Sequence, residues 1–282
     1  YENLGSDAKI TIYPVQKNNN VQLDGLTVLE NESNISPTLY LNYYYNQLQN
    51  QTPLSKILSQ MLRTYLSTKS DTTIDTSFFT DYQKIRPYIA YKLICAPLNE
   101  NLLHDVPHKS FLDLAIVFYC LLPNSTNQNA TIPIRNSHLT LWNTDLETLC
   151  RQAAMNTPSL LPVTLHDLNS LLLNNPTPDR RDAPEPGSPM YILSNSQKLY
   201  GAAAMLYPGI LESFSSRIAN SFYLLPSSIH EVILLPDHPE FLSANLNKMV
   251  REVNDSQVLP QEVLSDHVYY YSKEDQTIKI PS

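Results

Sequence analysis

Apolar and polar residues alternate near the start of the chain in a way that is typical of β-strands. Ile10 and Ile12 stand in one such run, and a second run follows at 21–28. Because successive side chains of a strand point to opposite faces, this alternation indicates strands with one buried face. The asparagine-rich stretch 17–20 between the runs favours a turn, so a hairpin is predicted, with Gly25 at a bulge or a point of close packing.

Apolar residues recur every three or four positions in later stretches, a period typical of helices. The clearest case is 53–66, where one apolar stripe follows Pro53, a residue that fits the first turn of a helix. Before another such stretch, Thr144 can cap a helix and Glu147 stands three residues on, as in a capping box. The pattern predicts helices over 41–49, 53–66, 81–95, 136–141, 144–155, 164–173, 208–219 and 240–253.

Continuous or alternating apolar runs predict the remaining strands. The run 111–122 is dominated by large apolar residues and is predicted to be a central strand. Other strands are predicted over 36–41, 130–134, 190–194, 201–206, 221–226, 229–235, 267–272 and 277–281. This order of elements predicts an α+β fold with mixed, largely antiparallel sheets flanked by helices.

One segment is rich in proline and divides the pattern in two. Residues 174–189 contain Pro176, Pro178, Pro184, Pro186, Pro189 and Gly187. Such a composition favours a linker or flap rather than a helix or strand. We therefore expect an N-terminal α+β subdomain at 1–174, a linker or flap at 175–189, and a C-terminal α+β subdomain at 190–282.

The composition excludes some functions. The chain has 282 residues, a net charge of −8 and only 16% charged residues, without a cluster of lysine and arginine. General nucleic-acid binding is therefore not expected, because the phosphate backbone requires a basic face. Only five glycines are present, and none forms a phosphate-binding loop. No cofactor is predicted.

The cysteines and the apolar runs predict a cytoplasmic protein outside the membrane. Cys95, Cys120 and Cys150 are three in number and widely spaced, which favours free thiols in a reducing compartment. No pair of them has metal-ligand spacing. The apolar run 112–123 contains Asp113 and is shorter than the roughly 20 residues of a membrane helix.

Polar side chains gather just before the apolar strand predicted at 229–235. They are the hydroxyls of Ser227 and Ser228, the imidazole of His230 and the carboxylate of Glu231. In one interpretation His230 is a general base or ligand contact, and Ser227 or Ser228 positions a ligand. In the other, His230 only enters the strand and bonds one of the serines, and Glu231 points to the opposite face.

Other candidates are scattered along the chain. Asp113 is a carboxylate in an apolar run, which is costly unless it is paired or displayed in a site. His108 can share a site with Asp113 only if the fold brings the two side chains together. Asn254 is either a ligand contact or a residue of a helix end. His104 and His108 are four apart, as in zinc helices, but Pro107 interrupts the helix and no third ligand follows, so no metal site is predicted.

Several separated blocks of the sequence resemble one bacterial family. They are VQLDGL at 21–26, VPH at 106–108, FLDLA at 111–115, LYPG at 206–209, the stretch 226–236, VNDSQV at 253–258 and VLSD at 263–266. Together they are similar to the family known as domain of unknown function 5688, which is associated with anaerobic gut bacteria. The resemblance implies a bacterial cytoplasmic protein, and it implies no activity, cofactor or catalytic residue.

Two functions from different classes remain open. The leading hypothesis is a non-catalytic binding or protein-interaction module whose partner is a protein or a small molecule, because the residues show no assembled catalytic motif. The alternative is a hydrolase-like enzyme with a His/carboxylate site between the two halves. That enzyme would gather His230, Glu231, Asp113 and His108 in one cleft.

Overall fold

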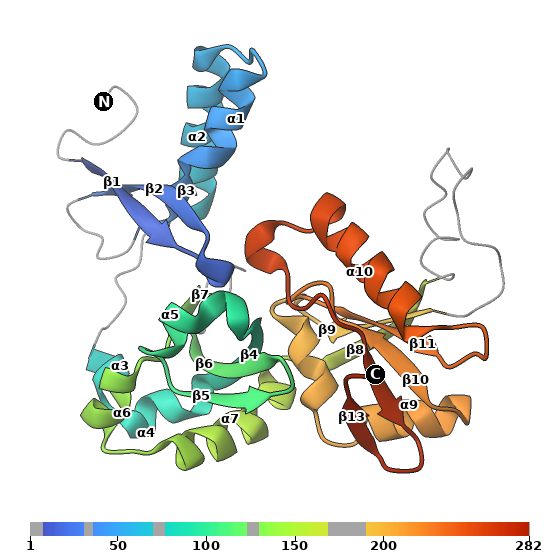
Figure 1. The fold of residues 1–282 in the computed structure, drawn as a ribbon. Helices are drawn as coiled ribbons and strands as arrows, with labels where there is room; N and C mark the ends of the chain where they lie inside the picture. The colour runs from blue at the N-terminus through green and yellow to red at the C-terminus, as the bar shows by residue number, and fades with distance from the viewer. Residues whose placement is uncertain (1–7, 31–35, 70–76, 123–129, 169–189, 282) are drawn as a thin grey trace.

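The structure is a computed structural model that describes residues 8–30, 36–69, 77–122, 130–168 and 190–281 (Figure 1). These residues form three open sheets, and every registered pair of neighbouring strands is antiparallel. Helices accompany each sheet, so the predicted α+β class is confirmed. The segment 175–189, predicted to be a linker or flap, lies outside the described residues, and the division into subdomains that rests on it stays a prediction.

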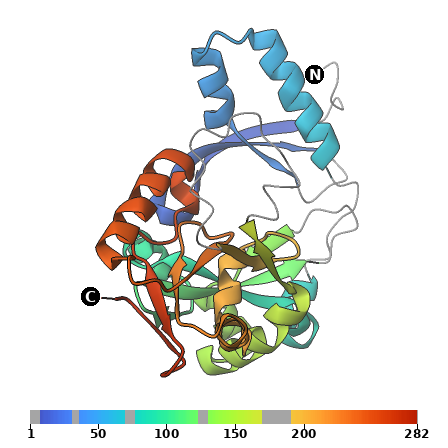
Figure 2. The ribbon, with the colours of Figure 1, turned by 90° about the vertical axis from the view of Figure 1, so that its right-hand side faces the viewer.

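The N-terminal sheet carries a projecting pair of helices (Figures 1 and 2). Its elements are β1 (Lys9–Gln16), the short turn η1 (Asn18–Asn20), β2 (Gln22–Leu29), β3 (Thr38–Tyr40), α1 (Leu41–Gln49) and α2 (Leu54–Thr68). The predicted hairpin is confirmed by the β1–β2 register, in which Tyr13 lies opposite Gly25. A Cβ on Gly25 would lie 2.7 Å from side-chain carbons of Val15 and Thr38, so this glycine marks close packing.

The second sheet has the strand order β4-β6-β5, and β7 also pairs with β6. Its strands are β4 (Ile89–Cys95), β5 (His108–Phe111), β6 (Leu114–Leu122) and β7 (Ala130–Pro133). The helical elements around it are α3 (Ser77–Thr80), α4 (Tyr82–Ile85), η2 (Arg86–Tyr88), η3 (Pro97–Asn99), α5 (Glu100–Leu103), α6 (Asn136–Trp142) and α7 (Leu146–Leu160). The side chain of Asp145, not Thr144, caps α7 by accepting a hydrogen bond from the Thr148 amide.

Two predictions for this region were wrong. In place of the predicted helix 81–95, α4 ends at Ile85, and the 3-10 helix η2, which contains Pro87, leads into β4. The apolar side chains of β4 are buried on both faces and so mimic a helical period. The predicted strand 111–122 is two strands, because the chain turns at Leu112, which has a left-handed φ of 54°. Asp113 therefore lies in a turn and not inside a strand.

The third sheet has the order β13-β12-β10-β11-β9-β8. Its strands are β8 (Val163–Asp167), β9 (Tyr191–Asn195), β10 (Phe222–Leu225), β11 (Val232–Pro236), β12 (Tyr269–Ser272) and β13 (Thr277–Lys279). The accompanying helical elements are η4 (Gly201–Leu206), α9 (Ile210–Ile218), α10 (Ser243–Gln257) and η5 (Pro260–Glu262). β8 pairs with β9, so this sheet includes residues on both sides of 175–189.

Two predictions were also wrong here. Residues 163–167 form β8 rather than the start of a helix, because pairing with β9 satisfies their backbone. Residues 201–206 form the buried 3-10 helix η4 rather than a strand. The small side chains of Ala202, Ala203 and Ala204 are buried, so this short helix packs closely against neighbouring elements.

One hydrophobic core joins the second and third sheets. It includes Phe118 and Cys120 of β6 together with Leu193 of β9 and Phe222 of β10. The N-terminal sheet and its helices have a separate small core around Val28. Within the described residues, no helix has the length and apolar character needed to cross a membrane.

Candidate functional site

A pocket of about 400 Å³ lies where the N-terminal turn, the second sheet and the third sheet region meet. We call it the joint pocket. Its floor is the face of β4 and β6 that carries Lys92, Ile94 and Tyr119. Strand pairing places these side chains together, since Ala90 lies opposite Tyr119 and side chains alternate along both strands. The remaining lining residues are Gln16, Lys17, Asn18, Asn101, Leu102, Asp105, Val106, Thr131, Pro133, Arg135 and Tyr200.

Tyr200 closes one side of the joint pocket and is held there by a tight turn. The amide side chain of Asn195 accepts hydrogen bonds from the backbone of Gln197 and Leu199 and donates one to the Leu199 carbonyl. Tyr200 itself has a left-handed φ of 51°. Such a backbone conformation is unfavourable for a large residue and persists only where neighbouring contacts enforce it.

The residue after Tyr200 must be glycine for this arrangement. A Cβ on Gly201 would collide with Ser194 Oγ and with the carbonyl oxygen of His230. The absence of a side chain lets η4 lie directly against the loop that precedes β11. The imidazole of His230 stacks on Tyr200, with ring centroids 6.0 Å apart and planes within 10°.

The N-terminal turn closes another side, and Asn19 attaches it to both other regions. The Asn19 side chain donates to the carbonyls of Pro260 (2.8 Å) and Val263 (2.6 Å). It also accepts a hydrogen bond from Asn99 Nδ2, while the Asn19 amide donates to Asn99 Oδ1. Asn18 adds a hydrogen bond to the carbonyl of Gln261. Three segments far apart in sequence thereby meet beside the pocket.

The joint pocket is electropositive. The ammonium groups of Lys17 and Lys92 lie 4.1 and 4.2 Å from the ring centroids of Tyr40 and Tyr200. Among the described residues neither lysine has a carboxylate within ion-pair distance. Arg135 is paired with Asp105. Two half-buried cations without a carboxylate partner favour an anionic ligand.

Two buried polar atoms in the lining lack a hydrogen-bond partner among the residues that the structure describes. They are the hydroxyl of Tyr119, a side chain that is only 2% exposed, and Asn18 Oδ1. A buried polar group without a partner costs roughly 1–3 kcal/mol, so such atoms are expected to be satisfied by a bound molecule or water. Burial, together with neighbouring Tyr200 and Tyr207, holds the pKa of Tyr119 far above its ordinary value, so the hydroxyl can donate a proton in a hydrogen bond.

Of the candidates at 227–231, His230 reaches the joint pocket indirectly, by stacking on its lining residue Tyr200. Ser228 Oγ accepts a hydrogen bond from the His230 backbone amide. His230 Nδ1 is 3.1 Å from the Lys198 carbonyl, and Nε2 is 3.8 Å from Glu262. Ser227 contributes its carbonyl to the Leu264 amide, and Glu231 is exposed.

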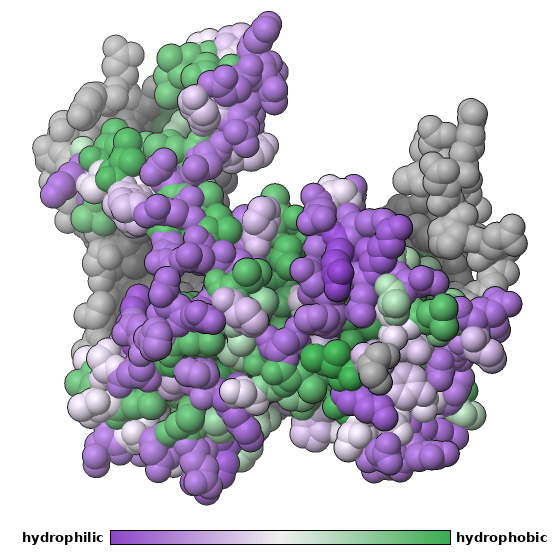
Figure 3. All heavy atoms as spheres, viewed as in Figure 1, coloured by the Kyte–Doolittle hydropathy of each residue, from purple (hydrophilic) through white to green (hydrophobic). Residues whose placement is uncertain are grey.

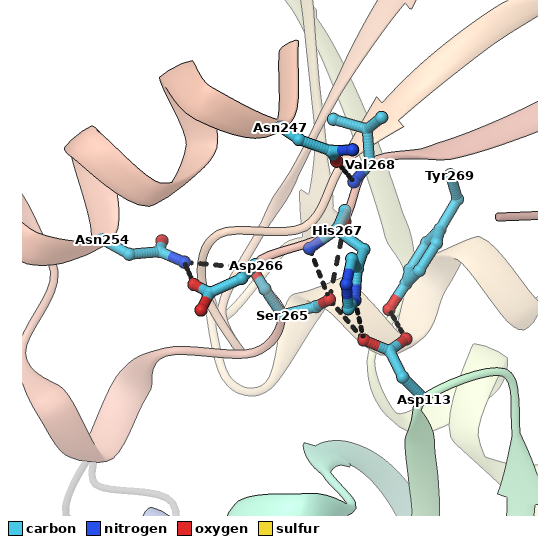
Figure 4. A network of polar contacts seen from close by, with 8 residues as sticks. All are labelled: Asp113, Asn247, Asn254, Ser265, Asp266, His267, Val268 and Tyr269. Carbon is cyan, nitrogen blue, oxygen red and sulfur yellow. Dashed lines mark hydrogen bonds and ion pairs between the residues drawn. The ribbon is translucent and has the colours of Figure 1, made fainter. Parts of the chain in front are cut away.

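Asp113 and Asn254 belong to a second polar network (Figure 4). Asp113 accepts hydrogen bonds from Ser265 Oγ (2.6 Å), His267 Nδ1 (3.0 Å) and Tyr269 Oη (2.5 Å). Asn254 of α10 donates to the Ser265 carbonyl and to Asp266 Oδ1. Burial raises the pKa of Asp113, but the bonds from His267, Ser265 and Tyr269 outweigh burial and hold it below its ordinary value.

This second network stabilises the junction of two sheets and is not a catalytic triad. A serine triad requires the serine hydroxyl to bond the imidazole and the imidazole to bond the carboxylate. Here the hydroxyl of Ser265 and the imidazole of His267 both bond the same carboxylate, that of Asp113. The network instead ties the β5–β6 turn to the segment leading into β12.

The four residues proposed for a hydrolase-like site have separate surroundings. His108 begins β5, and its ring Nδ1 lies 3.1 Å from the Val106 carbonyl. Among the described residues no hydrogen bond or ion pair joins any two of His108, Asp113, His230 and Glu231. Nor do three His, Cys, Asp or Glu side chains gather as metal ligands in this part of the chain.

The fold and the joint pocket define an α+β protein with an electropositive cavity bordered by the N-terminal turn, the second sheet and Tyr200. A model of the family of unknown function DUF5688 matches residues 1–273, and the chain belongs to that family. No curated protein and no solved structure matches the chain.

No pattern in the sequence marks Tyr119, Tyr200 or Asn19 as a site residue, and Lys92 is not among the predicted site residues. One signal was present, because Lys92 interrupts the apolar run 89–95. A charged residue inside a buried strand is costly unless it serves a site or a partner. The run was interpreted as a helix, in which Lys92 would simply face solvent. The other three residues become notable only when distant segments meet.

Proposed function

We propose that this protein is a binding module that holds a small anionic molecule in the joint pocket. The observation that carries the proposal is the combination of Lys17 and Lys92 with the buried hydroxyl of Tyr119: within the described part of the chain, neither lysine has a carboxylate partner and the hydroxyl has no hydrogen-bond partner. Lysine is a common ligand for phosphate, and a hydroxyl donor adds a directed hydrogen bond. The pocket volume also lies in the range of small-molecule sites.

The lining favours a particular ligand chemistry. Phosphate or carboxylate oxygens suit the two ammonium groups and the Tyr119 hydroxyl. Asn18 Oδ1 can only accept a hydrogen bond, so the ligand also carries a hydroxyl or amino group. A phosphorylated or carboxylated metabolite with such a group satisfies both requirements. The three free cysteines favour a reducing compartment such as the cytoplasm, where such metabolites occur.

Binding can be measured by isothermal titration calorimetry with inorganic phosphate, sugar phosphates, nucleoside monophosphates and dicarboxylates. Lys92→Met and Tyr119→Phe keep the apolar volume and remove one donor each. A hydrogen bond to a charged group contributes roughly 1.5–3 kcal/mol, so each variant is expected to weaken binding about 10- to 100-fold.

The matched control is Lys248→Met, which removes an exposed lysine on α10 that pairs only with Glu252. This variant is expected to bind as the wild type does. The proposal fails if none of these anions binds, or if Lys248→Met weakens binding as much as Lys92→Met. Circular dichroism of each variant verifies that the fold is intact.

A further inference from the structure

The N-terminal sheet and its two helices have a hydrophobic core of their own. We call β1–β3, α1 and α2 the N-terminal unit. Among the described residues, no cluster of buried apolar side chains has members from both this unit and residues 77–281. Figures 1 and 2 show the unit projecting away from the other two sheets, and hydrophilic residues predominate in Figure 3 where it meets them. A polar contact between separately packed parts of a chain permits relative motion.

Hydrogen bonds of the hairpin turn attach the N-terminal unit to the rest of the chain. Asn19 is bonded to Asn99 through both its backbone amide and its side chain, and the same side chain donates to two carbonyls in and next to η5. Asn18 donates to a further carbonyl of η5. Each such bond replaces a bond to water, so a contact built from a few of them can open without unfolding of either part.

The joint pocket lies across this contact. Lys17 and Asn18 line it from the N-terminal unit, whereas Lys92, Tyr119 and Tyr200 line it from the rest of the chain. Both lysines are half-buried and carry the same charge, so they repel each other across the pocket when no anion is bound. An anion between them replaces this repulsion by attraction to both sides.

We propose that an anion in the joint pocket holds the N-terminal unit against the rest of the chain and thereby fixes where α1 and α2 project. This inference rests on the proposed function, since it concerns the same ligand in the same pocket. A ligand that contacts both sides binds the closed junction more tightly than the open one, and it therefore shifts the equilibrium toward closure. The position of α1 and α2 then depends on whether the ligand is bound.

The backbone amide of Asn19 reports directly on the junction. It donates to Asn99 Oδ1 at 2.8 Å, so it exchanges its hydrogen with solvent when the junction opens. The matched reference is the backbone amide of Lys17, which lies in the same turn and donates to the Val21 carbonyl inside the N-terminal unit at 2.7 Å. Opening of the junction leaves this second bond intact.

The test follows hydrogen exchange of both amides by NMR, in chloride and in inorganic phosphate at equal ionic strength. Calorimetry in the same buffer gives the Kd for phosphate. At about five times this Kd, mass action lowers the open fraction about sixfold, so the Asn19 amide should exchange about sixfold more slowly and the Lys17 amide at an unchanged rate. The control variant Lys248→Met, which removes the exposed lysine of α10, is expected to reproduce both results.

Lys17→Met separates repulsion across the pocket from a purely structural role of this side chain. Without phosphate, the Asn19 amide of the variant is expected to exchange about twofold more slowly than in the wild type, because the repulsion from Lys92 is gone. The loss of a contact that only supports the turn would instead make this amide exchange faster, and that result would overturn the inference.

The two proposals can fail separately. Phosphate that binds in calorimetry without slowing exchange at Asn19 overturns the inference and leaves the proposed function standing. Equal slowing of the Asn19 and Lys17 amides has the same meaning, because the ligand then stiffens the turn and not the junction. Failure of phosphate to bind, seen in the calorimetry itself, overturns the inference as well.

Discussion

At the scale of single residues, Asp113 shows how one side chain can link distant parts of the chain. Its carboxylate is only 17% exposed and accepts three side-chain hydrogen bonds from the segment 265–269. A buried carboxylate is tolerable only with such partners. The sequence indicates that a carboxylate at this position is costly, and the fold supplies its hydrogen-bond donors from distant residues. No local sequence pattern could identify those donors.

Asp113→Asn is expected to lower the free energy of unfolding by about 2 kcal/mol, because an amide replaces a charged acceptor and presents a donor to groups that already donate. Urea denaturation followed by circular dichroism measures this difference. The control is Asp255→Asn on the exposed side of α10, which is expected to change the free energy by less than about 0.5 kcal/mol. Equal effects of the two variants would contradict the assigned role.

The same residue predicts a pH dependence. The pKa of Asp113 is lower in the folded protein than in the unfolded chain. Its contribution to stability is therefore fully present above the unfolded pKa of about 3.9 and is lost as the pH falls through the lower folded pKa. The difference in free energy of unfolding between wild type and Asp113→Asn should accordingly shrink on acidification below about pH 4. A difference that stays constant with pH would contradict the role assigned to the Asp113 carboxylate.

At the scale of elements, η4 and the turn before it position Tyr200 against Lys92. The turn depends on the Asn195 amide, and η4 depends on the missing side chain at Gly201. Close backbone approach of this kind is a frequent reason for glycine outside a flexible loop.

Gly201→Ala is expected to destabilise the protein by roughly 1–3 kcal/mol, because the added carbon would force apart Ser194 and the His230 carbonyl. Thermal unfolding measures the loss. Displacement of Tyr200 is expected to weaken anion binding in the same variant. Ser196→Ala, an exposed position in the same turn, is the control. A Gly201→Ala protein as stable as wild type would refute the close-packing argument.

At the scale of the whole molecule, Asn19 joins three regions that are separated by about 80 and 240 positions in sequence. Both Asn19 and Asn20 have a left-handed φ of 58°. Only Asn19 reaches the other regions, since the Asn20 side chain accepts a hydrogen bond from Gln16. The two residues thus provide a matched pair of substitutions.

Asn19→Gly keeps the left-handed backbone and removes three side-chain hydrogen bonds. We expect the free energy of local opening at the junction to fall by about 2 kcal/mol, which corresponds to roughly 30-fold faster hydrogen exchange in 97–101 and 260–264. Hydrogen-exchange mass spectrometry measures this rate. Asn20→Gly introduces the same backbone freedom and should leave those segments protected. Similar exchange in both variants would show that backbone freedom, not the side chain, controls the junction.

Local patterns were sufficient for many elements. The hairpin of β1 and β2, helix α2, and strands β10 and β11 follow from alternation or helical period with suitable turn residues. The helix predicted over 89–95 is wrong because apolar side chains buried on both faces of β4 remove the alternation. The helix predicted from 164 is wrong because pairing with β9, a distant segment, makes 163–167 a strand. Of the candidates at 227–231, His230 stacks on Tyr200, which lines the joint pocket, but the lining includes none of the four candidates, and the lysines of the pocket are not among them.

The sequence by itself determined the α+β class, the family, the small fraction of charged residues and the negative net charge. These properties depend on composition, short-range periodicity and shared blocks of residues. Only the tertiary structure decided which polar groups meet. Lys17, Lys92 and Tyr200 come from three separate segments, and their distances depend on how the three regions pack. Whether a buried group is satisfied is likewise a property of its neighbours in space. For this reason the unpartnered hydroxyl of Tyr119 could be recognised only in the folded chain.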